Sequence, residues 1–348
     1  MYPSFRWFGK EDPVSLEYIR QIPGVKDIVG SLFELPVGEI WSVEAIQELK
    51  ETIETAGLNL SVIESIPIHE DIKLGRSSRD KWIDNYCQSI RHMGQVGIPV
   101  LCYNFMLVFD LVRTDLEHPL KDGGTALEYD EAKLSNFDFS EGTPDMPAWV
   151  KYSAEELNEL LTAYQTMSGE QLWENLEYFL KRVVPVAEAS GVRMAIHPDD
   201  PPWSVFGLPR IITGIEGLQR LVNTVDSPSN GITLCTGSLG ANPNIDMVKV
   251  ADVFGKQNRI NFVHLRNVQH ETDTKFHEAP HPSEFGELDM HAIVSKLHEH
   301  KYMGPMRPDH GRMIWGETGT PGYGLYDRAL GMMYIQGLSE AILKSNKS

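Results

Sequence analysis

A short apolar segment, a polar turn and an amphipathic helix follow one another eight times along this chain. Strands that alternate with helices indicate a parallel sheet, because a parallel connection must cross back over the sheet, usually as a helix. Eight such units in 348 residues predict a (β/α)8 barrel, a fold that takes ~250 residues before insertions. In chain order the strands are expected at 4–8, 25–32, 59–66, 99–104, 193–196, 231–234, 260–263 and near Met306.

The alternative fold is a doubly wound open sheet, which has the same alternation of strands and helices. That fold binds phosphate groups at a glycine-rich turn after its first strand. The turn after the first expected strand reads Phe8-Gly9-Lys10-Glu11, which lacks that pattern. The (β/α)8 barrel is therefore the preferred prediction.

The regular alternation stops between Leu107 and Ser168, where acidic residues, glycines and prolines are frequent and apolar periodicity is weak. A loop of this length is uncommon inside a compact domain unless it has a function or is disordered. We therefore predict one barrel domain over 1–348, with an insertion at 107–168 after the fourth strand. We expect this insertion to contain a helix near 154–166 and to act as a lid or a subunit contact.

Composition excludes several classes of protein. The formal net charge of −18 argues against a nucleic-acid partner, because phosphate binding relies on a basic surface. No apolar run approaches the ~20 residues of a membrane helix, and the first residues lack a signal-peptide pattern, so we expect a cytoplasmic protein with no membrane contact. Three scattered cysteines are too few for a disulfide framework.

Four potential metal ligands occur where strands five to eight are expected to end: His197, Cys235, His264 and Asp309. Neighbouring strand ends lie side by side in a barrel, and its active site is at their carboxyl ends. Imidazole, thiolate and carboxylate groups suit a divalent first-row metal. Because catalysis needs open coordination positions, Mn²⁺ or Fe²⁺ fits better than a closed zinc site. Each residue alone has a simpler interpretation, as a scaffold histidine or a small buried cysteine, so the prediction depends on all four together.

Two residues beside these ligands are expected to transfer protons. His310 directly follows Asp309, and Tyr323 lies between two glycines that leave its ring accessible. A phenol with its ordinary pKa of ~10 is a poor base, so we expect nearby cations to lower the pKa of Tyr323.

Four further residues are expected to contact the substrate. Arg266 lies two residues after His264, so the two side chains should point the same way, and its guanidinium could clamp a carboxylate. Arg6 and Trp7 on the first strand and Asn104 on the fourth could complete the rim of the site. For Arg6 and Trp7, packing within the barrel is an equally good interpretation.

Longer motifs in the chain resemble the mannonate dehydratase family. They include His-Pro-Asp-Asp-Pro-Pro (197–202), Leu-Cys-Thr-Gly-Ser (234–238), Asn-Phe-Val-His-Leu-Arg-Asn-Val (261–268), Arg-Pro-Asp-His-Gly-Arg (307–312) and Thr-Pro-Gly-Tyr-Gly (320–324). The resemblance covers essentially the whole chain. It implies a xylose-isomerase-like barrel that converts D-mannonate to 2-keto-3-deoxy-D-gluconate and water in hexuronate breakdown. It also implies a metal held by His197, Cys235, His264 and Asp309, and proton transfer by His310 and Tyr323.

The implied reaction fits these residue types. It removes the weakly acidic proton on C2, beside the carboxylate, and expels the C3 hydroxyl, so it needs a cation, a base and an acid. We expect Tyr323 to take the proton and His310 to protonate the hydroxyl, although the roles could be reversed. Two alternatives are a metal-dependent sugar isomerase on the same barrel and a non-catalytic sugar-acid-binding protein. A small sugar acid is the expected substrate, and a homodimer or higher homo-oligomer is the expected assembly.

Overall fold

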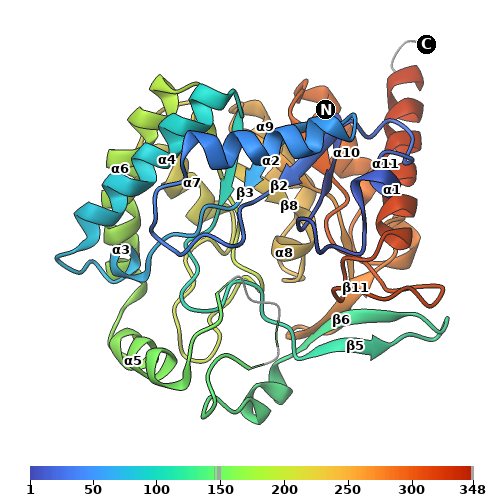
Figure 1. The fold of residues 1–348 in the computed structure, drawn as a ribbon. Coiled ribbons are helices and arrows are strands. Elements are labelled where there is room, and N and C mark those ends of the chain that lie inside the picture. Colours follow the sequence, from blue (N-terminus) through green and yellow to red (C-terminus); the bar gives the residue numbers. More distant parts are fainter. Residues whose placement is uncertain (145, 147–149, 346–348) are drawn as a thin grey trace.

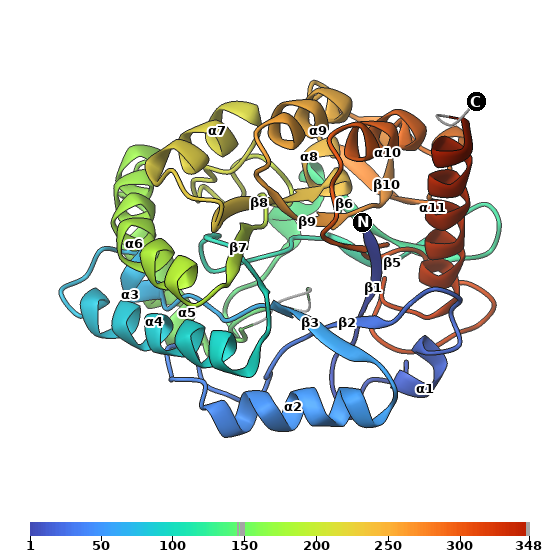
Figure 2. The same cartoon turned by 90° about the horizontal axis from the view of Figure 1, so that it is seen from above.

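The computed structural model describes residues 1–144, 146 and 150–345, and its centre is a closed parallel barrel. Its strands are hydrogen-bonded in the order β1-β12-β9-β8-β7-β4-β3-β2, which closes the ring. Figure 2 looks into this ring and shows the helices around it. The barrel that the sequence predicts is confirmed. Its strands are β1 (Tyr2–Arg6), β2 (Asp27–Gly30), β3 (Asn59–Glu64), β4 (Val100–Tyr103), β7 (Arg193–Ile196), β8 (Asn230–Cys235), β9 (Ile260–His264) and β12 (Pro305–Arg307).

Helices form an outer layer, and several begin where the sequence places a capping residue. Ser42 accepts a hydrogen bond from the Ala45 N–H at 3.1 Å and so begins α2. Ser168 begins α6 through a capping box with Gln171. The helices are α1 (Leu16–Ile19), α2 (Val43–Thr55), α3 (Glu70–Lys73), α4 (Arg79–Val96), α5 (Ala154–Tyr164), α6 (Gly169–Ala189), α7 (Ile215–Thr224), α8 (Thr236–Gly240), α9 (Met247–Lys256), α10 (Met290–Glu299) and α11 (Tyr326–Ser345).

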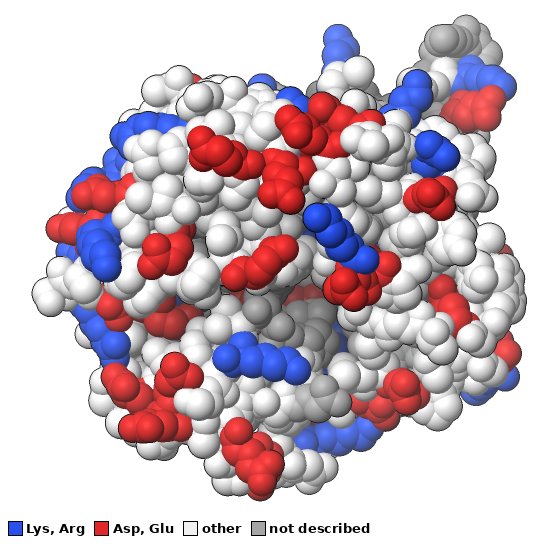
Figure 3. Space-filling view, in the orientation of Figure 1, with Lys and Arg blue, Asp and Glu red and all other residues white. Residues whose placement is uncertain are grey.

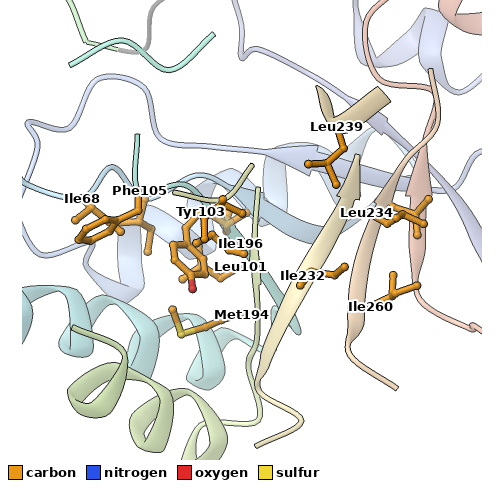
Figure 4. Close-up of a cluster of buried hydrophobic side chains, with 14 of the residues drawn as sticks. Ile68, Leu101, Tyr103, Phe105, Met194, Ile196, Ile232, Leu234, Leu239 and Ile260 are labelled. Carbon is orange, nitrogen blue, oxygen red and sulfur yellow. The ribbon is translucent and has the colours of Figure 1, made fainter. Parts of the chain in front are cut away.

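The barrel wall separates two apolar layers. Figure 4 shows Leu101 and Tyr103 of β4 and Met194 of β7 directed toward the flanking helices, and the Tyr103 ring lies 6.2 Å from that of Phe179 on α6. The intervening strand residues point into the barrel. A smaller buried cluster fills this interior: Val29, Val62, Val100, Cys102, Ala195 and Phe262. Side chains at the top of this inner layer therefore face the carboxyl ends of the strands, where the site lies.

A second sheet lies beside the carboxyl end of the barrel, and the sequence did not predict it. Four antiparallel strands are paired in the order β10-β11-β6-β5. Two come from the insertion, β5 (Asp115–Pro119) and β6 (Thr125–Asp130), and two follow β9, β10 (Asn267–Thr272) and β11 (Lys275–Ala279). Positions 126–129 of β6 are all buried, so both faces are covered and the apolar–polar alternation of a surface strand is missing.

The helix expected within the insertion is α5, which begins at a Ser153 capping box. Figure 1 shows α5 and the second sheet on the same side of the barrel. The Tyr164 hydroxyl of α5 donates a hydrogen bond to Glu70 of α3, which also accepts one from Lys73 at 2.7 Å. The insertion is thus attached to the barrel by buried polar contacts at one end and by β-pairing at the other.

The surface carries the negative charge that composition indicates. Figure 3 shows acidic side chains spread over one face, with basic side chains between them. Within the described part of the chain, no helix has the length and apolar character needed to cross a membrane.

Candidate metal centre and active site

The pairing of the barrel strands places the predicted ligands next to one another. Cys235 of β8 is the register partner of His264 of β9, which pairs on its other side with Arg307 of β12. His197 directly follows β7, the neighbour of β8. One ligand atom from each of His197, Cys235 and His264 lies within 4.8 Å of the others. Three of the four predicted ligands therefore converge at the carboxyl end of the barrel.

Asp309 approaches the same three residues from beyond β12. Its Oδ2 lies 3.4 Å from the Cys235 Sγ, and its Oδ1 lies 3.7 Å from His264 Nδ1. Burial opposes ionisation, but His310 and Arg307 outweigh it and hold the pKa of Asp309 well below its ordinary range. The carboxylate is thus charged and near the other donor groups.

The backbone at Asp309 explains why two adjacent residues face the same cavity. Asp309 has φ of 59°, in the left-handed region that aspartate tolerates better than most residues. Along a regular strand its neighbour His310 would point to the opposite side. The turn breaks this alternation, and both residues line one cavity with Arg6, Asn104 and Tyr323.

A second set of possible ligands, Glu64, Cys102 and His264, also has donor atoms within 4.8 Å. Metal binding by cysteine requires the thiolate. Burial raises the pKa of Cys102 well above its ordinary value, and its Sγ lies 3.3 Å from the Thr233 hydroxyl inside the barrel. The Glu64 carboxylate accepts a hydrogen bond from Arg307 at 2.9 Å. The set containing Cys235 therefore suits a metal better than the set containing Cys102.

Tyr323 and His310 are close to each other, with ring centroids 5.4 Å apart. The expectation that nearby cations of the protein lower the pKa of Tyr323 is wrong. Burial raises the pKa of Tyr323 to about 12, and the opposing effects of Arg307 and Arg6 are smaller. The phenol is therefore neutral unless a further positive charge is added.

Arg266 does not lie in the position expected of a substrate clamp. Its Nη1 donates to both oxygens of Glu278 at 2.8 Å, its Nη2 donates to Asp200, and its Nε donates to Asp309 at 2.7 Å. Every nitrogen of the guanidinium thus faces a protein carboxylate. The contact with Asp309 holds that carboxylate, and this arrangement differs from the substrate clamp that the sequence predicts.

Trp7 also lies outside the cavity. It is buried and lines a neighbouring groove with Phe8 and Phe33, whereas Arg6 lines the cavity itself. Adjacent strand residues point to opposite sides, so Arg6 and Trp7 could not both face the substrate. Asn104 lies at the cavity wall, where its Oδ1 accepts a hydrogen bond from the Met106 N–H at 3.1 Å.

Arg113 and Glu278, which were not predicted from the sequence, complete the buried network. Arg113 donates to Asp200 at 2.8 Å and to Glu278 at 3.0 Å, and its side chain is fully buried. Glu278 Oε1 also lies 3.2 Å from His310 Nδ1. Arg113 lies just before β5 and Glu278 lies on β11, 165 residues further along the chain, so their spacing could not have revealed this contact.

The fold and cavity define a xylose-isomerase-like (β/α)8 barrel with its candidate site at the strand ends. The crystal structure of a xylose isomerase domain protein from Planctomyces limnophilus has this fold, with a TM-score of 0.56 at 13% identity over 99% of this chain and 98% of the other. At that identity the likeness concerns the fold alone.

Sequence comparison gives the family. The model of the D-mannonate dehydratase (UxuA) family matches residues 1–348, and this chain belongs to that family. A mannonate dehydratase of Streptococcus uberis is 54% identical over 348 residues, covering 100% of both chains. The crystal structure of mannonate dehydratase from Streptococcus suis serotype 2 has a TM-score of 0.93 at 50% identity, covering 99% of this chain and 96% of the other.

Proposed function

We propose that this chain is a metal-dependent hydro-lyase that converts D-mannonate to 2-keto-3-deoxy-D-gluconate and water, a step of hexuronate breakdown. The main support is the convergence of His197, Cys235 and His264 beside a cavity that also contains Tyr323 and His310, in a chain that matches the D-mannonate dehydratase family over its whole length.

His197, Cys235, His264 and Asp309 would hold the metal, and this donor set suits Mn²⁺ or Fe²⁺. When bound, the metal supplies positive charge that stabilises the enolate-like charge on the substrate and favours ionisation of a nearby phenol. Arg266 and Arg307 keep the Asp309 carboxylate in place, with contacts of 2.7 and 2.8 Å.

Tyr323 takes the proton from C2, and His310 protonates the departing C3 hydroxyl. The Glu278 carboxylate, 3.2 Å from His310 Nδ1, stabilises positive charge on the imidazole ring. Arg6 lines the same cavity; burial lowers the pKa of Arg6 to about 10, so it remains a cation at neutral pH and can attract the substrate carboxylate. Asn104, at the cavity wall, can hydrogen-bond a substrate hydroxyl.

The insertion covers this cavity in our proposal. Asp110 and Leu111, at its beginning, line the cavity, and Arg210 donates to the backbone oxygens of Phe109 and Asp110 at 2.8 and 3.1 Å. A cover excludes water from the reacting groups and so strengthens the electrostatic interactions within the site.

Metal-depleted protein should have no activity on D-mannonate, and adding back Mn²⁺ or Fe²⁺ should restore formation of a 2-keto-3-deoxy acid. Zn²⁺ and Mg²⁺, added separately, serve as comparisons, because zinc favours closed sets of four ligands and magnesium disfavours thiolate. Colorimetric detection of the product distinguishes dehydration from isomerisation, which forms no 2-keto-3-deoxy acid. No turnover with any of the four metals would refute the proposed function.

We also propose that the chain acts in the cytoplasm as a homodimer or higher homo-oligomer. Exposed aromatic side chains support an interface: Trp315 is 74% exposed and lies 5.5 Å from the Tyr326 ring, centroid to centroid. Light scattering should give a mass at least twice that of one chain. A single-chain mass at all micromolar concentrations would contradict this assembly.

A further inference from the structure

The outer face of the second sheet carries polar residues that the reaction does not use. On β11, Phe276 and Glu278 face the buried side, where Glu278 contacts Arg266. Because side chains alternate along a strand, His277 lies on the opposite face. There it is the register partner of Glu128 on β6, so the two residues share one face of the sheet.

Three residues from three strands bring metal-binding atoms together on this face. One ligand atom from each of His118 (β5), Glu271 (β10) and His277 (β11) lies within 4.8 Å of the others. The two imidazole rings are 5.3 Å apart, and His277 Nδ1 lies 3.4 Å from Glu271 Oε1. All three residues line one surface groove, so an ion from solvent can reach them.

Glu128 supplies an independent reason to expect a ligand. Its side chain is fully buried, and its Oε2 lies 3.0 Å from His118 Nδ1. Within the described part of the chain, neither this oxygen nor His277 Nδ1 makes a hydrogen bond of good geometry. A carboxylate against one nitrogen of an imidazole is the usual partner of a metal-binding histidine, because it fixes the tautomer and orients the other nitrogen toward the metal.

The local charge also favours a cation. Two lysines lie among the carboxylates: Lys275 is within 4 Å of Glu128, Asp130 and Glu271, and Lys133 is within 4 Å of Glu128 and Asp115. Four carboxylates therefore face two ammonium groups. A divalent ion would balance the remaining two negative charges, and Lys275, 2.8 Å from Glu271, would have to release that carboxylate.

We propose that His118, Glu271 and His277 form a second divalent-metal site, separate from the barrel centre, with Glu128 orienting His118. Two imidazoles, one carboxylate and a water molecule match the tetrahedral coordination of zinc. The ion would join β5 of the insertion to the β10–β11 hairpin. This site does not depend on the proposed reaction, because it shares no ligand with the cavity.

Cobalt(II) titration of the full-length, metal-depleted protein separates the two sites. Only the barrel centre contains a thiolate, so only its occupation gives a thiolate-to-cobalt charge-transfer band in the near ultraviolet. We expect the wild-type protein to bind two equivalents of Co²⁺, one with this band and one with visible ligand-field absorption alone. Equilibrium dialysis of Zn²⁺ gives the stoichiometry independently.

Variants test whether the second Co²⁺ ion binds at His118, Glu271 and His277. His277→Ala should no longer bind the equivalent of Co²⁺ that lacks the charge-transfer band, and it should still bind the other equivalent. Glu271→Gln should give the same result. It carries little risk to folding, because Glu271 is at the surface. Glu128→Gln should lower the affinity for this second Co²⁺ ion by about 10–100-fold. The matched control is His291→Ala, which removes an exposed imidazole on α10 and should leave both equivalents unchanged. A single equivalent in the wild type, or a second one unaffected by both His277→Ala and Glu271→Gln, would overturn the proposal.

Discussion

Replacing Tyr323 by phenylalanine is expected to lower kcat on D-mannonate by about 10²–10⁴-fold, the usual contribution of one acid–base group. The change removes only the hydroxyl, so the contact of the ring with Phe8, at 4.7 Å between centroids, can remain. Steady-state kinetics of the metal-loaded enzyme measures the effect. A matched control is Tyr86→Phe, which removes a buried hydroxyl from α4 outside the cavity and should change kcat by less than about threefold, within ordinary variation for remote sites.

Exchange of the C2 hydrogen of D-mannonate with solvent distinguishes the role of Tyr323 from that of His310. If Tyr323 takes the C2 proton, His310→Asn should still exchange this hydrogen with deuterated solvent while forming no product. Tyr323→Phe should lose both exchange and product formation. Exchange that survives in Tyr323→Phe and disappears in His310→Asn would reverse the two roles, and exchange that survives in both variants would remove both residues from the C2 step.

The closeness of His197, Cys235 and His264 could be predicted from the sequence, because neighbouring strands of a barrel end side by side. Once strands five to eight are recognised, the residues at their ends must be neighbours, and the pairing of Cys235 with His264 follows. The prediction needed only local information, the apolar period of each strand and helix. It required no knowledge of how distant segments pair.

The supporting network could not be predicted, because it depends on the second sheet, whose strands were not expected from the sequence. Glu278 reaches Arg113 because β11 pairs with β6 of the insertion, far away along the chain. It reaches Arg266 because β10 and β11 form a hairpin that the sequence did not predict. β6 is buried on both faces. β11 has only five residues, and the charged Glu278 lies on its buried side, so the sequence of β11 shows no apolar–polar alternation. The direction of the Arg266 side chain was predictable, but its carboxylate partners Asp200, Glu278 and Asp309 were not.

Replacing Arg266 by methionine is expected to destabilise the protein by about 3–5 kcal/mol, the usual cost of removing one partner from a buried ion pair. The methionine fills similar space but leaves the carboxylates of Glu278, Asp200 and Asp309 without a cation that contacts all three. Urea unfolding at pH 7 measures the loss. The surface arginine Arg182, paired with Asp80 and Asp84 while about 40% exposed, is the matched control, and its replacement by methionine should cost about 0–1 kcal/mol.

The pH dependence of the same measurement tests whether charge causes the loss. Burial alone would raise the pKa of Glu278, but Arg266 and His310 outweigh it and lower this pKa from 4.5 to about 2. A carboxyl with a depressed pKa in the folded protein stabilises it above the unfolded value, and this contribution is lost as the pH falls through the folded value. Stability of the wild type should therefore decline between about pH 4.5 and pH 2 partly through Glu278. In Arg266→Met this part of the decline should shrink and move to higher pH. An unchanged acid profile together with a loss below 1 kcal/mol would mean that Arg266 contributes packing rather than charge.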